Sequence, residues 1–253
     1  MECPQLGKVA GIFKMKVGVE MLKLDHVVYF TEKLPTEVVE EQISLGWHTV
    51  VGGSHEKWGT HNALMYVKNA YIEWLSVEHP KIAETANHQL VDLLLRDISE
   101  GEDWGTICFS VDGLDAFNER LKSLGFKTSG VLQAERETLD GNLRKWKMLF
   151  VDQELSSKLP LPFFIEWGEK EEERLMGLRN DGTISPDNEQ LEITECHFSV
   201  NLPKEEVTKW ATILSAEVSE ENSIKLPNTL LKFMRNESVN RNERLTDVVI
   251  EHV

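Results

Sequence analysis

The order of hydrophobic and polar positions repeats along the chain, and the first copy begins near residue 22. Residues 24–30, LDHVVYF, are rich in branched and aromatic side chains and predict a strand. The next segment predicts a helix, because Val39 and Ile43 lie one helical turn apart and Gly46 is a natural C-terminal stop. Three strand-like runs follow, separated by polar or glycine-containing turns: HTVVGG, THNALMYV and AYIEWLSVE.

The same order of strand, helix, strand, strand, strand returns twice. The second copy opens with WGTICFSVDG, continues with the helical pattern LDAFNERLKSLGF, and supplies strands in VLQAER, LRKWKMLFV and PFFIEWGE. The third copy opens with ECHFSVNL and PKEEVTKWATILS, followed by AEVSEE, NTLLKFMRN and LTDVVIEHV. The helix ends SLGW and SLGF match, as do YIEWLSVE and FFIEWGE. Such a repeat indicates one supersecondary unit that is used three times.

The segments between the copies suggest how the chain is divided. Residues 22–168 hold the two copies that match best, and residues 193–253 hold the third. A stripe of apolar residues predicts a helix between the first two copies, roughly over 80–98. Residues 169–192 predict a linker with a solvated acidic run. Residues 1–21 lack clear periodicity, so we expect an extension without fixed structure, or a start codon assigned too early.

Composition and charge argue against several classes of protein. The 253 residues are 41% hydrophobic and 28% charged, which is ordinary for a globular protein, while the net charge of −16 argues against nucleic acid or an anionic membrane as a partner. No apolar run approaches the ~18 residues needed to cross a bilayer. Three cysteines without CxxC spacing fit a reducing, cytoplasmic location. No GxGxxG, GxSxG or P-loop motif is present, so no nucleotide cofactor is expected.

Strand alternation assigns side chains to the two faces of each predicted sheet, because residues i and i+2 share a face. The face that packs against helices should be uniformly apolar, which leaves His26 and Glu73 on the other, concave face. The same reading places Thr106 and Glu166 on the concave face of the second copy. A lone strand histidine is often a hydrogen-bonded core residue. Two buried carboxylates, however, would be costly unless a cation or protons neutralise them.

The tandem order of elements resembles the vicinal oxygen chelate superfamily and, within it, the glyoxalase-like domains. The resemblance covers residues 22–168 well and residues 193–253 more weakly. It implies an α+β fold in which paired βαβββ units form curved mixed sheets with helices outside. It also implies that the two units enclose a cavity for a small-molecule ligand.

In that superfamily the metal ligands come from the first and fourth strands of both units, and the corresponding residues here are His26, Glu73, Thr106 and Glu166. We expect His26, Glu73 and Glu166 to bind a divalent ion such as Mn²⁺, Zn²⁺, Ni²⁺ or Fe²⁺. Thr106 is a poor ligand, so the site could hold metal with three protein groups plus water, or could have lost metal altogether. Glu73 and Glu166 are also the groups expected to move a proton.

Further side chains are expected to contact the substrate. The stretch GTHNAL resembles glyoxalase-like domains and makes Asn62 and His61 candidates. Tyr66 shares a face with Asn62 in the predicted strand, and Trp146 and Thr106 are expected to line the cavity from the second copy. Ordinary core packing explains Trp146 equally well.

The third copy repeats the His26/Glu73 pattern with His197 and Glu251. If the first two units pair, the third has no partner within the chain, and its uncovered sheet would expose an apolar patch. We therefore expect a homodimer. A degenerate unit that supports dimerisation and binds nothing is the simpler interpretation of His197 and Glu251.

Two functions stay open from the sequence. One is a metal-dependent lyase, isomerase or dioxygenase in which Glu73 or Glu166 moves a proton. The other is a protein of the same fold that binds a small hydrophobic molecule without turnover. Fold alone does not choose between them.

Overall fold

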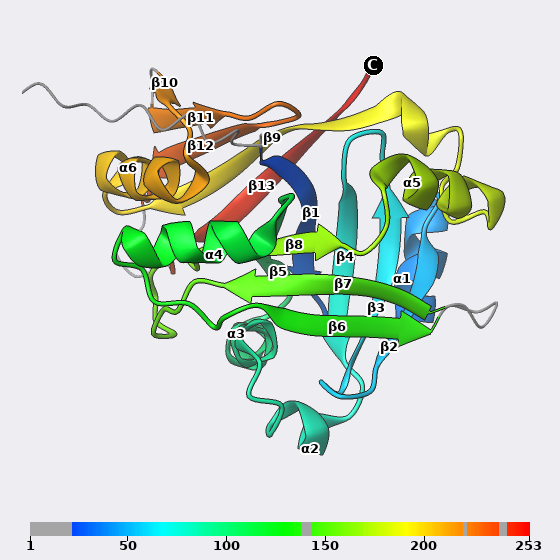
Figure 1. The fold of residues 1–253 in the computed structure, drawn as a ribbon. Helices are drawn as coiled ribbons and strands as arrows, with labels where there is room; N and C mark the ends of the chain where they lie inside the picture. The colour runs from blue at the N-terminus through cyan, green and yellow to red at the C-terminus, as the bar shows by residue number, and fades with distance from the viewer. Residues whose placement is uncertain (1–21, 138–142, 220–221, 238–241) are drawn as a thin grey trace, which may run out of the picture.

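The computed structural model describes residues 22–137, 143–219, 222–237 and 242–253. Two βαβββ units share one eight-stranded sheet with the order β2-β3-β4-β1-β5-β8-β7-β6 (Figure 1). The first unit comprises β1 (Lys23–Phe30), α1 (Pro35–Ser44), β2 (Val50–His55), β3 (Thr60–Tyr66) and β4 (Tyr71–Val77). The second comprises β5 (Asp103–Ser110), α4 (Leu114–Ser123), β6 (Leu132–Glu137), β7 (Leu143–Phe150) and β8 (Phe163–Trp167). The predicted α+β fold of tandem units is confirmed.

Equivalent hydrogen bonds in the two units show which residues correspond to each other. In each unit the first strand pairs parallel with the fourth, and β1 pairs antiparallel with β5 at the centre of the sheet. The amide of Thr31 donates to Leu75 O, and the amide of Val111 donates to Ile165 O in the same way. Counting back along the strands from these bonds makes Thr106 the counterpart of His26 and Phe163 the counterpart of Glu73.

Both central strands contain a β-bulge at matching places. The pairing skips Asp25 in β1, between Leu24 and His26, and skips Gly105 in β5, between Trp104 and Thr106. A bulge adds one residue to a strand and re-aims its side chains, so strict alternation of faces fails there. Asp25 and Gly105 are therefore counterparts that simple period-2 reasoning misplaces.

Separate cores cover the two faces of the large sheet. On the helix side, Val27, Ile107 and Phe109 join a large core with residues of α4, including Leu114 and Leu121. The concave side holds a second core, against which the connecting helix packs with Leu90, Leu93 and Leu94. The connection contains α2 (Pro80–Ala83), α3 (Gln89–Asp97) and η1 (Ile98–Glu100). The single helix predicted over 80–98 is thus interrupted at residues 84–88, and α3 carries its apolar stripe. While α1 and α4 lie outside as expected, α3 thus packs on the concave side.

The third unit forms a five-stranded sheet with the order β10-β11-β12-β9-β13. Its elements are η2 (Asn188–Gln190), β9 (Leu191–Val200), α6 (Pro203–Leu214), β10 (Val218–Ser219), β11 (Ser223–Lys225), β12 (Leu230–Arg235) and β13 (Arg244–His252). Because β12 is the strand that runs parallel to β9, it is the fourth strand of this unit. The prediction that Glu251 occupies the position of Glu73 is wrong, since Glu251 lies on the antiparallel β13, where it pairs with Glu192.

Within the chain, the third unit is packed firmly onto the paired units. Its core residues, including Phe198 and Trp210, belong to the same cluster as Phe109 on the helix side of the large sheet. Arg120 of α4 donates to carbonyl oxygens at the end of α6, and the two helices lie side by side (Figure 1). Arg244 forms a bidentate ion pair with Asp97, at 2.7 and 2.9 Å.

The other face of the third sheet is charged rather than apolar. His197 Nε2 lies 2.6 Å from Glu195 Oε2, and Lys232 Nζ donates to both oxygens of Glu195 at 2.6 Å. The prediction that the third sheet exposes an apolar patch, which led us to expect a homodimer, is therefore wrong, because the apolar side of that sheet is covered within the chain. The homodimer itself stays a prediction.

The predicted linker over 169–192 contains a helix, α5 (Glu171–Asn180), together with η2. Its acidic run is largely exposed, as expected, but Arg174 and Leu178 are buried against the paired units. The predicted N-terminal extension, residues 1–21, lies outside the described residues. Among the residues that the structure describes, no helix is long and apolar enough to cross a membrane.

Candidate functional site

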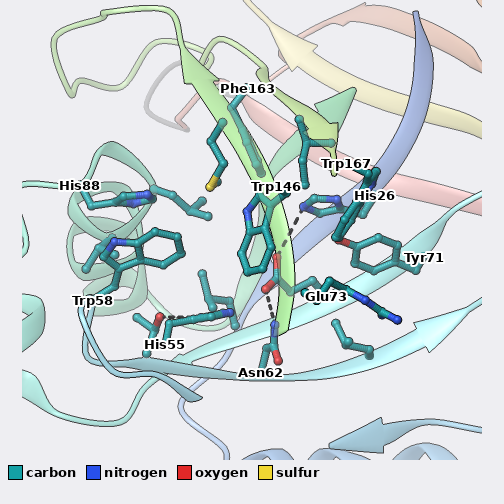
Figure 2. Close-up of a pocket in the computed structure, with 18 of the residues that line it drawn as sticks. His26, His55, Trp58, Asn62, Tyr71, Glu73, His88, Trp146, Phe163 and Trp167 are labelled. Atoms are coloured by element: carbon teal, nitrogen blue, oxygen red, sulfur yellow. Dashed lines mark hydrogen bonds and ion pairs between the residues drawn. The ribbon is translucent and has the colours of Figure 1, made fainter. Parts of the chain in front are cut away.

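A pocket opens on the concave side of the large sheet, between its two halves (Figure 2). Strands β1, β3 and β4 supply the first-unit side, β7 and β8 the second-unit side, and the start of α3 one end. The free space is narrow, about 60 Å³, which holds only a few water molecules. Aromatic and imidazole rings dominate the lining: His26, His55, Trp58, Tyr66, Tyr71, His88, Trp146, Phe163 and Trp167.

At one end of the pocket, His26 and Glu73 face each other and both are buried (Figure 2). His26 Nε2 lies 3.5 Å from Glu73 Oε2. The amide of Asn62 donates to the other carboxylate oxygen, Oε1, over 2.6 Å. These residues come from adjacent strands, β1, β4 and β3, whose register places them on one face. The structure thus brings together three of the side chains predicted for the site.

The second nitrogen of His26 is held by a carboxylate that the sequence did not single out. His26 Nδ1 lies 2.8 Å from Asp25 Oδ1, and the bulge turns both side chains to the same side of β1. Trp167 Nε1 donates to Asp25 Oδ2 over 2.8 Å, and the Arg174 guanidinium lies 4.0 Å from the same oxygen. Burial alone would raise the pKa of Asp25, but the hydrogen bond from His26 and the charges of His26 and Arg174 lower it. Asp25 is therefore an ionised acceptor that orients the imidazole.

Aromatic rings fix the plane of the His26 imidazole. Tyr71 stacks on it at 4.4 Å between ring centroids, and Phe163 meets it edge-on at 5.4 Å. Burial raises the pKa of Tyr71 well above its usual value, so its hydroxyl stays protonated. Burial likewise raises the pKa of Cys108, which lies close to Asp25 and His26 and keeps its thiol proton.

Glu166 does not belong to this site. Its carboxylate accepts hydrogen bonds from the amides of Gly113 and Leu114 at the start of α4, and Lys147 Nζ lies 3.0 Å away. The pocket is lined instead by its neighbours Ile165 and Trp167. The assignment of Glu166 to the concave face is wrong, because matching FFIEWGE to YIEWLSVE aligned letters rather than strand register; by register, Phe163 corresponds to Glu73. The metal-ligand and proton-transfer roles predicted for it have no geometric support.

The other predicted substrate contacts are divided by the structure. Asn62, Tyr66 and Trp146 line the pocket. His61 alternates with Asn62 on β3 and points to the other face, where burial lowers its pKa. Thr106 lines a neighbouring hollow of about 550 Å³, which lies beyond Leu90 and Phe163 and shares those two residues with the pocket.

The opposite end of the pocket holds a group of rings that the sequence did not reveal. His88, at the start of α3, lies 4.3 Å from Trp58 between ring centroids and meets Phe150 edge-on at 5.0 Å. His55 lies nearby, with Nδ1 3.0 Å from Thr60 Oγ1 (Figure 2). Trp146 lies between this end and His26 in the view. The sequence around His88 contains no recognisable motif, and the position of its loop depends on tertiary packing.

The side chains present do not fit a four-ligand metal centre of the kind that the resemblance implies. At the corresponding four positions the structure has His26, Glu73, Thr106 and Phe163. The Phe163 ring lies against the His26 imidazole, where a further ligand would be needed, and Thr106 is a weak neutral donor. Asp25, His26 and Cys108 do lie close together, but the carboxylate of Asp25 is already hydrogen-bonded to His26 and Trp167. Only His26 and Glu73 remain as free strong donors among these positions.

Paired βαβββ units around a cavity define the vicinal oxygen chelate class of proteins. A family model described as a glyoxalase-like domain matches residues 24–214, and the chain therefore belongs to the glyoxalase-like domain family. Comparison with curated proteins gives no significant match.

Solved structures share the fold at low sequence identity. A hypothetical protein from Staphylococcus aureus is 22% identical, with a TM-score of 0.74 and 92% of each chain covered, so the likeness includes the third unit. Methylmalonyl-CoA epimerase from Mycobacterium tuberculosis is 17% identical with a TM-score of 0.40, over 60% of this chain and 91% of its own. The enzyme of the same name from Streptomyces coelicolor is 13% identical, also at 0.40, over 58% and 98%. At these identities the comparison shows fold alone.

Proposed function

We propose that the protein binds a small, largely apolar molecule in the pocket and moves a proton on it with Glu73, as an isomerase or lyase does. The observation that carries this proposal is the buried Glu73 carboxylate, with Oε1 held by Asn62 at 2.6 Å and Oε2 facing His26 Nε2 at 3.5 Å. A positioned carboxylate next to an imidazole is suited to general acid–base catalysis.

The neighbouring residues set up the proton path. With its Nδ1 proton directed at the ionised Asp25, His26 presents the lone pair of Nε2 to Glu73. Glu73 can therefore take a proton from the ligand, share it with His26, and return it to a neighbouring ligand atom. Asn62 keeps the carboxylate in place throughout.

The lining supports an uncharged ligand. Trp58, Trp146, Trp167 and Phe163 offer flat apolar surfaces, and the carboxylate of Glu73 disfavours an anion beside it. Because the free space is about 60 Å³, a ligand of more than a few atoms must displace a ring, and we assign this movement to the half-buried Trp146. Tryptophan fluorescence should therefore change when a ligand enters.

The test is proton exchange on simple carbonyl compounds whose adjacent C–H is acidic, followed in D₂O by NMR. The wild type should accelerate deuterium incorporation, and Glu73→Gln should lose about 10²-fold or more of that acceleration. Glu166→Gln is the matched control, since it makes the same chemical change on the outer face, and it should exchange like the wild type. Equal exchange by the wild type and Glu73→Gln would reject the catalytic role of Glu73.

The predicted divalent ion is tested in the same assay. His26 and Glu73 could bind a cation only weakly, with water as the remaining ligands, because the second unit contributes Phe163 rather than a ligand. Exchange should therefore be unaffected by Mn²⁺, Zn²⁺, Ni²⁺, Fe²⁺ or a chelator. A metal-dependent rate that Glu73→Gln abolishes would replace this proposal with a metal-dependent lyase or isomerase.

The second candidate, binding without turnover, is favoured by one observation, the predominance of aromatic rings in the pocket. It predicts tight binding of apolar molecules and no exchange in any variant. The cytoplasmic location stays a prediction from cysteine content.

A further inference from the structure

His88 is a buried side chain that the proposed proton transfer does not use. It is 5% exposed, and it forms part of the pocket wall at the end opposite Glu73 (Figure 2). Trp58 packs against one face of its ring, with 4.3 Å between centroids, and the edge contact with Phe150 fixes the ring plane.

Neither ring nitrogen of His88 has a hydrogen-bond partner among the described residues. A buried polar group is normally hydrogen-bonded, and leaving one unpaired destabilises the folded protein. The destabilisation is larger for His88, since both Nδ1 and Nε2 are buried and unpaired. A purely structural residue at this position would be better as Leu or Phe.

The imidazole of His88 is neutral at physiological pH. Burial, together with the nearby His55, lowers its pKa from 6.5 to about 4. A neutral imidazole offers one N–H donor and one acceptor lone pair. It has no charge with which to compensate the desolvation of an anionic group. Arg144, a cation in the pocket wall, is paired through Nε with Glu169 at 3.1 Å.

We propose that the His88 end of the pocket binds a flat, uncharged ligand group that carries a hydroxyl, carbonyl or amide, packed against Trp58 and hydrogen-bonded to His88. This deepens the proposed function and rests on it, because it defines the substrate class. The substrate is a planar, uncharged molecule whose neutral polar group lies at His88 and whose reactive carbon lies at Glu73.

The test uses three one-ring probes, phenol, toluene and benzoate, with ¹⁵N-histidine-labelled protein. Phenol should shift the ring nitrogen signals of His88 on saturation. Toluene should bind without producing the shift that a hydrogen bond to a ring nitrogen causes. Benzoate should bind at least tenfold more weakly than phenol. This measurement needs no variant. If phenol does not bind, or saturates the protein without shifting His88, the proposal is overturned.

Variants then separate the hydrogen bond from packing. His88→Phe should weaken phenol at least tenfold and leave toluene unchanged, because only the ring nitrogens are lost. His79→Gln, an exposed histidine outside the pocket, should bind all three probes like the wild type. Equal phenol affinity in the wild type and His88→Phe would overturn the proposal.

The proposed proton transfer and the His88 site can fail independently. Glu73→Gln should retain the phenol-induced shift of His88, because phenol alone fills only that end, while it loses deuterium exchange. Exchange without any effect of phenol on His88 would remove the His88 assignment and leave the role of Glu73 standing. Phenol binding at His88 without exchange would leave a binding protein.

Discussion

The two halves of the eight-stranded sheet have matching backbones and very different side chains. Where the first unit has the bulge residue Asp25 followed by His26, the second has Gly105 followed by Thr106. Where the first has Glu73 on its fourth strand, the second has Phe163. The two units thus share the same backbone register, but only the first unit has buried ionisable groups at these positions.

This asymmetry explains how the pocket accommodates buried charge. The carboxylates of Asp25 and Glu73 need partners, and the first unit supplies His26 and Asn62 for them. The second unit presents Phe163 across the pocket and places its own Glu166 outside. The first unit thus supplies His26 and Glu73 and the second faces them mainly with aromatic side chains, an arrangement that suits the proposed proton transfer in a water-poor site.

The largest effect should come from giving the second unit the donors that it lacks. The double substitution Thr106→His/Phe163→Glu places an imidazole and a carboxylate at the two family positions. Without metal it should destabilise the protein by at least about 4 kcal/mol, because a buried ring is lost and a carboxylate is buried without a partner. Zn²⁺ or Mn²⁺ should restore much of that loss, measured by urea unfolding.

The control for the double variant is Thr106→Asn/Phe163→Gln, which has similar size but weaker donors. It should be destabilised without recovering on addition of metal. If neither variant responds to metal, the correspondence of the two units at these positions does not extend to ligand geometry.

Removing Asp25 should have the next largest effect. Asp25→Leu leaves the buried Arg174 without its counter-charge, and breaking such a pair costs about 3–5 kcal/mol. Because the folded-state pKa of Asp25 is lowered, its contribution is present above its ordinary value of 3.8 and is lost as the pH falls below it. Chemical denaturation at pH 7 and at pH 3 should show the difference between wild type and variant shrinking.

A double-mutant cycle with Arg174→Met checks the cause of that destabilisation. Asp25→Leu/Arg174→Met should be more stable than Asp25→Leu alone, since no unpaired charge remains. Additive losses would mean that Asp25 acts through His26 and Trp167 rather than through Arg174.

His88 should make the stability depend on pH in a second window. Its folded-state pKa of about 4 lies below the unfolded value of 6.5, so the unfolded chain binds the proton first. Stability attributable to His88 is therefore intact above pH 6.5, falls as the pH drops toward 4, and then levels off; the loss is roughly 3 kcal/mol. His88→Leu should lack this loss and be at least as stable as the wild type at pH 7. A wild type and variant with parallel pH profiles would contradict the assignment.

The sequence predicted the paired units because periodicity and repeat order report local structure. It placed His26, Glu73, Asn62 and Tyr66 on one face correctly, since β1, β3 and β4 alternate regularly through those residues. Glu166 was placed wrongly because two similar strand sequences differ in register, which the pairing of β5 with β8 and the bond from Val111 to Ile165 reveal.

Other site residues had no sequence signal. Asp25 joins the pocket side through a bulge, and alternation assigned its position to the opposite face. His88 reaches the pocket because α3 packs on the concave side, a tertiary arrangement that the periodicity of α3 does not contain. In the third unit, repeat order alone could not tell that β12 rather than β13 pairs parallel with β9.

The smallest expected effect tests the bulge itself. A Cβ at Gly105 would lie 2.3 Å from the Phe30 ring, so Gly105→Ala must move that ring and should cost about 1–3 kcal/mol. Phe30→Leu should relieve part of that cost in a double variant. Gly177→Ala is the matched control, since it lies in α5 with open space around it, and it should stabilise by up to about 1 kcal/mol. Equal, small effects in urea unfolding would mean that packing does not require glycine at position 105, the position that corresponds to Asp25 in the second unit.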